Sequence, residues 1–84
     1  MKKYRDEVIE ELKQLVGEWS TKKEDLQELV EEAIAGMHMG ALVEDCGEFM
    51  VVSFEDPDGK EKEVSVDYEL VGRTYTVTAV GEYW

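Results

Sequence analysis

The hydrophobic pattern of this chain changes its period once, close to residue 40, and that change limits the folds open to it. Before this point apolar residues recur every three or four positions, which is the spacing of one face of an α-helix. After it they alternate with polar residues, which is the spacing of a strand with one buried face. The chain has only 84 residues, so both halves must share one small core. We therefore predict a single domain over residues 1–84, of the α+β class.

The N-terminal half predicts two helices, over about residues 3–18 and 22–37. The apolar stripe of the first helix consists of Tyr4, Val8, Ile9, Leu12, Leu15, Val16 and Trp19. The stripe of the second consists of Leu26, Leu29, Val30, Ala33, Ile34 and Met37. Thr21 and Glu24 have the spacing of a capping box at the start of the second helix. Because the connecting loop is short, we expect the helices to form an antiparallel hairpin.

The C-terminal half predicts strands over about residues 41–44, 48–55, 62–70 and 73–80. The segment Asp56-Pro57-Asp58-Gly59 is typical of a tight turn between two of them. Tight turns join neighbouring strands antiparallel, so we expect a three- or four-stranded antiparallel β-meander. The helical hairpin would pack on one face of this sheet and leave the other face to solvent.

One strand does not fit a sheet with a single buried face. Residues 49–55 are apolar on both faces, and the chain ends on Glu82-Tyr83-Trp84, with two aromatic side chains last. We expect the second face of this strand to lie under a chain terminus or against another copy of the protein. A homodimer, through this strand or through the helical face, is therefore one arrangement that the sequence leaves open.

The net charge of −12 narrows the classes of partner. Such a chain repels phosphate, which argues against direct binding of nucleic acid or of an anionic membrane. The longest apolar runs are too short to cross a bilayer, and acidic residues stand where a signal peptide would be apolar. Cys46 is the only cysteine, so no intramolecular disulfide forms, and we expect a cytoplasmic protein.

The acidic residues are concentrated in the predicted sheet. Residues 39–84 hold eleven acids and three bases, a net −8, against ten acids and six bases, a net −4, in residues 1–38. Glu63, Asp67 and Glu69 fall on one face of one strand, where alternate residues are about 6.7 Å apart, a spacing comparable with that of phosphates along a nucleic-acid strand. A further group surrounds the predicted turn: Glu55, Asp56, Asp58 and Glu61. These side chains form either a solvated face that limits aggregation or a ligand for a basic groove.

No residue pattern predicts catalysis, a cofactor or a metal site. A Cys–His nucleophile needs His38 and Cys46 in contact, and these two side chains are too few for a closed zinc site. The turn lacks the calcium-loop pattern, because Phe54 and Ser65 occupy the first and last ligand positions. Carboxylates on an exposed strand also lack the desolvating pocket that general acid–base catalysis requires. We expect a protein that is not an enzyme.

Two functions follow as hypotheses. The first is an inhibitor that occupies the basic surface of a nucleic-acid-binding protein or nuclease by mimicking nucleic acid. In size and charge the chain is similar to the anti-CRISPR and anti-restriction proteins that phages and mobile elements carry against host defences. The alternative is a dimeric, non-enzymatic adaptor or regulatory protein that binds a partner through apolar surface: Trp19, Met37, Met39, Phe49, Phe54, Tyr83 and Trp84.

Overall fold

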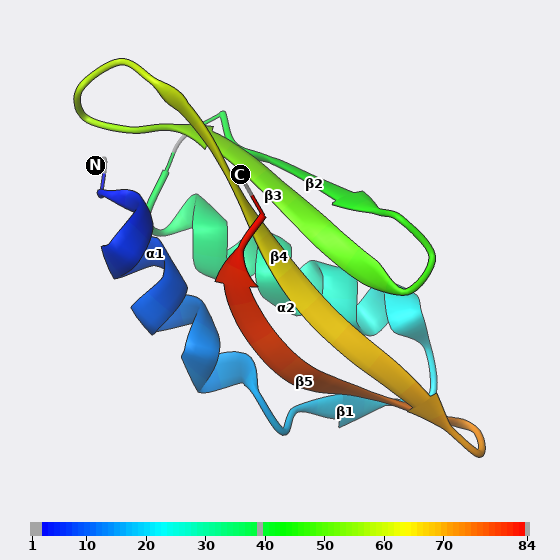
Figure 1. Cartoon of the computed structure of the whole chain (residues 1–84). Helices are drawn as coiled ribbons and strands as arrows, with labels where there is room; N and C mark the ends of the chain where they lie inside the picture. The colour runs from blue at the N-terminus through cyan, green and yellow to red at the C-terminus, as the bar shows by residue number, and fades with distance from the viewer. Residues whose placement is uncertain (1–2, 39, 84) are drawn as a thin grey trace.

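A curved five-stranded antiparallel sheet dominates the protein, and two helices pack against one of its faces (Figure 1). The computed structural model describes residues 3–38 and 40–83. Its elements are, in chain order, α1 (Arg5–Leu12), the 3-10 helix η1 (Lys13–Leu15), β1 (Trp19–Ser20), α2 (Lys23–Ala35), β2 (Leu42–Asp45), β3 (Phe49–Glu55), β4 (Glu61–Val71) and β5 (Thr74–Glu82). The strand order is β1-β5-β4-β3-β2, and the sheet forms a half-barrel.

The predicted helical hairpin on a three- or four-stranded meander is wrong. The segment between the helices forms β1, which pairs antiparallel with β5 and becomes the fifth strand. Two backbone hydrogen bonds extend this pairing, from Gly17 N to Val77 O and from Val77 N to Glu18 O, each 2.9 Å long. The physical reason is that β5 has an unpaired edge, and an unpaired row of backbone donors and acceptors is satisfied by any extended segment close by.

The first helix also ends earlier than its apolar stripe predicts. α1 ends at Leu12 and η1 at Leu15, after which Gly17 adopts a φ of +96°, in the left-handed region that stops a helix. Trp19, the last member of the predicted stripe, therefore lies in β1 with 64% of its surface exposed.

The second helix begins without the predicted Thr21–Glu24 capping box. Its N-cap is Lys22, and no side chain caps it. Ser20 supports the segment instead, because its hydroxyl accepts a hydrogen bond from the Lys22 N–H at 3.2 Å and donates one to Asp25 Oδ2 at 2.7 Å.

The core fills the space between the helices and the inner face of the sheet. Along β4 the apolar residues face inward, as the alternation in its sequence predicts, and Val64 and Val66 are fully buried. The helices contribute chiefly Val8, Ile9, Leu12, Leu26, Val30 and Ile34. Each such side chain adds about 1.5–3 kcal/mol on full burial, which makes this layer the main source of stability.

A β-bulge in β5 changes which residues face the core. Asp67 pairs with Ala79 and Tyr68 pairs with Val77, so Thr78 is an extra residue between two pairs. Simple alternation from Val77 would turn Ala79 inward, but Val80 is the buried residue and Ala79 is exposed. Bulges bend a strand and increase its twist, which fits the strong curvature of the sheet here.

The C-terminal segment covers part of the second face of β3. The ring of Tyr83 lies 5.5 Å from the ring of Phe49, centroid to centroid. Of the two expected arrangements, a chain terminus or another copy on this face, the contact shows the first; Trp84 lies outside the described residues.

Among the described residues, no helix has both the length and the apolar character needed to cross a membrane.

Candidate functional site

Four carboxylates form a line along the outer face of β4, which is the face turned away from the helices. We call Glu61, Glu63, Asp67 and Glu69 the acidic row. Strand geometry places alternate residues about 6.7 Å apart, and Ser65 fills the one position in the row that carries no acid. Glu61, Asp67 and Glu69 are exposed and Glu63 is half-buried. The row therefore brings together four of the seven residues that the sequence singled out.

The remaining three lie around the turn between β3 and β4. Glu55 is exposed and is the register partner of Glu61, so two carboxylates stand opposite one another at the end of the row. Asp58 is exposed in the turn, where its Oδ1 accepts a hydrogen bond from Lys60 N at 3.1 Å. Asp56 is only 4% exposed, and its backbone closes the turn through bonds to Lys60 O and Gly59 N. A partner cannot reach this carboxylate, so we leave it out of the surface.

In the described strands of the sheet, no base shares a face with the acidic row. Within the described residues, β2 to β5 contain a single base, Lys62, whose register partner is Phe54 on the face that the helices cover. The ion pairs recorded among residues 3–38 and 40–83 lie elsewhere: Lys3–Glu11, Arg5–Glu82, Lys13–Glu10 and Lys23–Asp45. Glu63, Asp67 and Glu69 are in none of them.

An aromatic side chain crosses the acidic row. Tyr83 N donates to Glu63 O at 3.1 Å, beside β4, while the Tyr83 ring contacts Phe49, the register partner of Asp67 on β3. The ring therefore passes over β4 between Glu63 and Asp67. Half of Tyr83 is still exposed, at 49%. A partner that covers the row also meets this ring.

Two further exposed carboxylates, one on the outer face and one in the turn before β3, were missed by sequence reasoning. Glu44 pairs with Val51 on β3 and is exposed, which widens the acidic face to β2. Glu48 is exposed in the turn that leads into β3. The sequence did hold a signal for Glu44, because its neighbour Val43 packs against the core and alternate residues of a strand point to opposite faces. It held none for Glu48, because in a turn the hydrophobic pattern does not indicate which way a side chain points.

A polar cluster ties α2 to the inner face of the sheet at the far end of the row. The Tyr68 hydroxyl donates to Asp45 Oδ1 at 2.7 Å, and Lys23 Nζ lies 2.9 Å from Asp45 Oδ2. Burial alone would raise the pKa of Asp45, but the hydrogen bonds from Tyr68, Gly47 N and Lys23 outweigh it, and the pKa is lowered. Burial and the bond to Asp45 raise the pKa of Tyr68, and the same carboxylate raises that of Lys23.

His38 and Cys46 do not come together as a nucleophilic pair. His38 is 2% exposed, its ring lies 4.7 Å from that of Phe54, and its Nε2 is 2.7 Å from Lys3 O. Cys46 is exposed and bonds through its N–H to Phe49 O, at the opposite end of β3, about 17 Å along the strand. His38 thus anchors the N-terminal segment. No group of three or more potential metal-ligating side chains gathers within the described part of the chain.

The apolar surface of the adaptor hypothesis is smaller than the sequence suggested. Met37 and Phe54 are core residues, at 2% and 4% exposure. Trp19 and Tyr83 are exposed, and Phe49 is half-buried. Met39 and Trp84 lie outside the described residues.

Comparison with models of protein families, with curated proteins and with solved structures found no match to this chain.

Proposed function

We propose that this protein is a non-enzymatic inhibitor that occupies the basic nucleic-acid-binding surface of another protein with the acidic row. The observation that carries the proposal is a line of carboxylates at alternate positions of one strand, interrupted at Ser65, without a recorded ion pair among the described residues. A face that serves only solubility needs charged residues but no particular spacing or sign, and it commonly carries lysine and glutamate side by side. A face of one sign produces the field that captures a basic groove quickly and orients it.

The arrangement of the row suits this role better than catalysis. Its carboxylates lie on an open strand, whereas an acid–base pair needs one carboxyl group desolvated. We place the protein in the cytoplasm, where exposed Cys46 stays reduced and nucleic-acid enzymes are present.

The test is displacement of labelled duplex DNA from a panel of restriction enzymes and RNA-guided nucleases, followed by fluorescence anisotropy. The row variant is Glu63→Lys, Asp67→Lys and Glu69→Lys. Its matched control is Glu28→Lys, Glu31→Lys and Glu32→Lys, three exposed acids of α2. Both variants change the net charge by six, from −12 to −6, so only the position of the charge differs.

We expect the wild type and the α2 variant to displace DNA from the target and the row variant to fail. Because the attraction is between exposed charges, raising the salt from 50 to 300 mM should weaken wild-type binding by about tenfold or more. Displacement that survives the row reversal, or that both reversals reduce equally, would contradict the proposal.

A further inference from the structure

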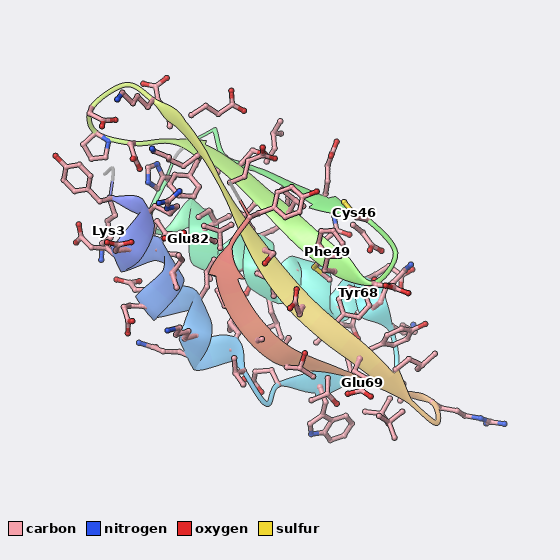
Figure 2. The ribbon with its side chains drawn as sticks, in the orientation of Figure 1. Lys3, Cys46, Phe49, Tyr68, Glu69 and Glu82 are labelled. Atoms are coloured by element: carbon pink, nitrogen blue, oxygen red, sulfur yellow. The ribbon has the colours of Figure 1, made fainter. Side chains whose placement is uncertain are left out.

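A notch opens in the sheet at the far end of the acidic row, because β4 is longer than its neighbour. The pairing of β3 with β4 ends at Phe49 and Asp67, while β4 continues to Val71. The turn that leads into β3 forms the opposite wall. The resulting pocket has a volume of about 660 Å³, which is within the range of about 300–1,000 Å³ for ligand pockets. Figure 2 shows Phe49, Tyr68 and Glu69 at this end of the sheet.

The lining of the notch combines carboxylates with aromatic rings. Three acids line it, Glu48, Asp67 and Glu69, and all three are exposed. The aromatic residues of the lining are Phe49, Tyr68 and Tyr75. Phe49 is the register partner of Asp67 and shares the outer face with Asp67 and Glu69, whereas the rings of Tyr68 and Tyr75, 5.9 Å apart and edge to face, form the inner side of the notch.

Lys23 also lines the notch, but its charge is already matched. Its Nζ lies 2.9 Å from Asp45 Oδ2, and Asp45 is not part of the lining. The three lining carboxylates therefore give the notch a net negative charge. An anion would be repelled, and an apolar ligand would desolvate those carboxylates without compensation.

We propose that the notch receives the guanidinium group of an arginine on the surface of the basic partner. This inference rests on the proposed function and names the side chain that the acidic face recognises. Guanidinium is the group that uses both parts of the lining, since it stacks on aromatic rings and donates paired hydrogen bonds to carboxylates. An ammonium group can use the carboxylates but does not present a flat face to the rings.

The test needs no partner protein. The ¹⁵N-labelled full chain is titrated with the capped peptide acetyl-Gly-Arg-Gly-amide and followed by NMR. The matched peptides carry lysine, or citrulline, which has the shape of arginine without its charge. We expect saturable shifts of the amide signals of Glu48, Asp67, Glu69 and Thr78 with arginine, weaker ones with lysine and none with citrulline. Equal shifts with citrulline and arginine would overturn the proposal.

A pair of variants on one hairpin locates the binding. Glu48→Gln removes a carboxylate from the notch, and Glu44→Gln removes one from the same face outside it. Losing a charged hydrogen bond should weaken arginine binding by about tenfold in Glu48→Gln. Binding in Glu44→Gln should stay within about twofold. Phe49→Leu should also weaken arginine more than lysine, because the Phe49 ring lies on the same face as the carboxylates and favours the flat cation.

The two proposals fail in different ways. If no arginine titration saturates while row reversal still abolishes DNA displacement, the row acts through charge alone and the notch is not a recognition site. If arginine binds in the notch while row reversal leaves displacement intact, the proposed function is wrong and the notch stands. An equal loss in Glu44→Gln and Glu48→Gln would also overturn the notch, because the attraction would then be general.

Discussion

At the scale of single residues, Asp45 connects three elements of the fold. It accepts hydrogen bonds from Tyr68 Oη at 2.7 Å and from Gly47 N at 2.9 Å, and it pairs with Lys23 at 2.9 Å. Through these bonds one carboxylate joins β2, β4 and the first turn of α2. Its side chain is 17% exposed, so the contacts are partly shielded from water and from salt.

We predict that Asp45→Asn lowers the free energy of unfolding by about 1–3 kcal/mol at pH 7, because it removes the ion pair and weakens the bond from Tyr68. The pKa of Asp45 is lowered on folding, so its stabilisation is present above its ordinary pKa of 3.8 and is lost as the pH falls through the lower folded pKa. Urea unfolding at pH 7 and below pH 4 should show the difference between variant and wild type shrinking in acid.

The control for this prediction is Asp58→Asn, an exposed turn acid whose bond to Lys60 N an asparagine can also accept. It should change stability by less than about 0.5 kcal/mol at both pH values. A difference between Asp45→Asn and wild type that is constant across the range would show that the carboxylate charge is not what stabilises the fold.

Residue-level features were the hardest to predict from the sequence. The alternation in β4 correctly indicated that Glu63, Asp67 and Glu69 point away from the core. No periodicity extends into the turn, so nothing distinguished buried Asp56 from exposed Asp58, which have the same side chain two positions apart. The burial depends on how the hairpin folds back, and that is a tertiary property.

At the scale of elements, β1 shows how a two-residue strand can change a fold. Hydrophobic periodicity identifies a helix over several turns and a strand over about four or more residues. The two residues Trp19–Ser20 are too few to show either period. The segments of β4 and β5 did carry an alternation. What the sequence could not predict was that the edge of β5 would recruit the segment between the helices.

The register of β5 was unpredictable for a related reason. A bulge inserts one residue without changing composition, so Thr78 is indistinguishable in sequence from the threonines beside it. Its effect is to exchange Ala79 for Val80 in the core. The larger side chain is the one buried, which favours the bulged register over the regular one.

We predict that Gly17→Ala destabilises the protein by about 1–2 kcal/mol, the penalty for a β-carbon in the left-handed region, since φ there is +96°. No atom lies within 4 Å of the added methyl group, so strain and not collision is the cause. Hydrogen exchange at the Val77 amide, which donates to Glu18 O, should accelerate if β1 loosens.

Gly81→Ala is the matched control for that experiment. It also has open space around the new methyl group, but its φ lies outside the left-handed region. Its stability should stay unchanged or rise by up to about 1 kcal/mol, through a smaller entropy of the unfolded chain. Equal losses in the two variants would show that conformation at Gly17 does not control the pairing of β1 with β5.

At the scale of the whole molecule, the charges are sorted by face. Three of the four recorded ion pairs involve α1 or η1, and the fourth joins α2 to the inner face. Within the described residues, Glu63, Asp67 and Glu69 on the outer face of the sheet belong to none of these pairs. Such a separation gives a strong directional field, and it raises the free energy of the folded state through self-repulsion.

We predict that removing the charge of the row stabilises the protein. Glu63→Gln, Asp67→Asn and Glu69→Gln together should raise the free energy of unfolding by about 0.5–1.5 kcal/mol at low salt, because the repulsion within the pairs Glu61–Glu63 and Asp67–Glu69, each about 6.7 Å apart, is removed. The gain should vanish in 1 M salt, where the Debye length is about 3 Å.

The matched control is Glu10→Gln, Glu11→Gln and Glu82→Gln. These substitutions change the net charge equally but remove recorded ion pairs, so they should give no gain in stability or a small loss. Urea unfolding at 10 mM and 1 M salt measures both variants. A row variant that is less stable than the wild type at low salt would mean that these acids support the fold and are not retained at a cost to stability for a partner.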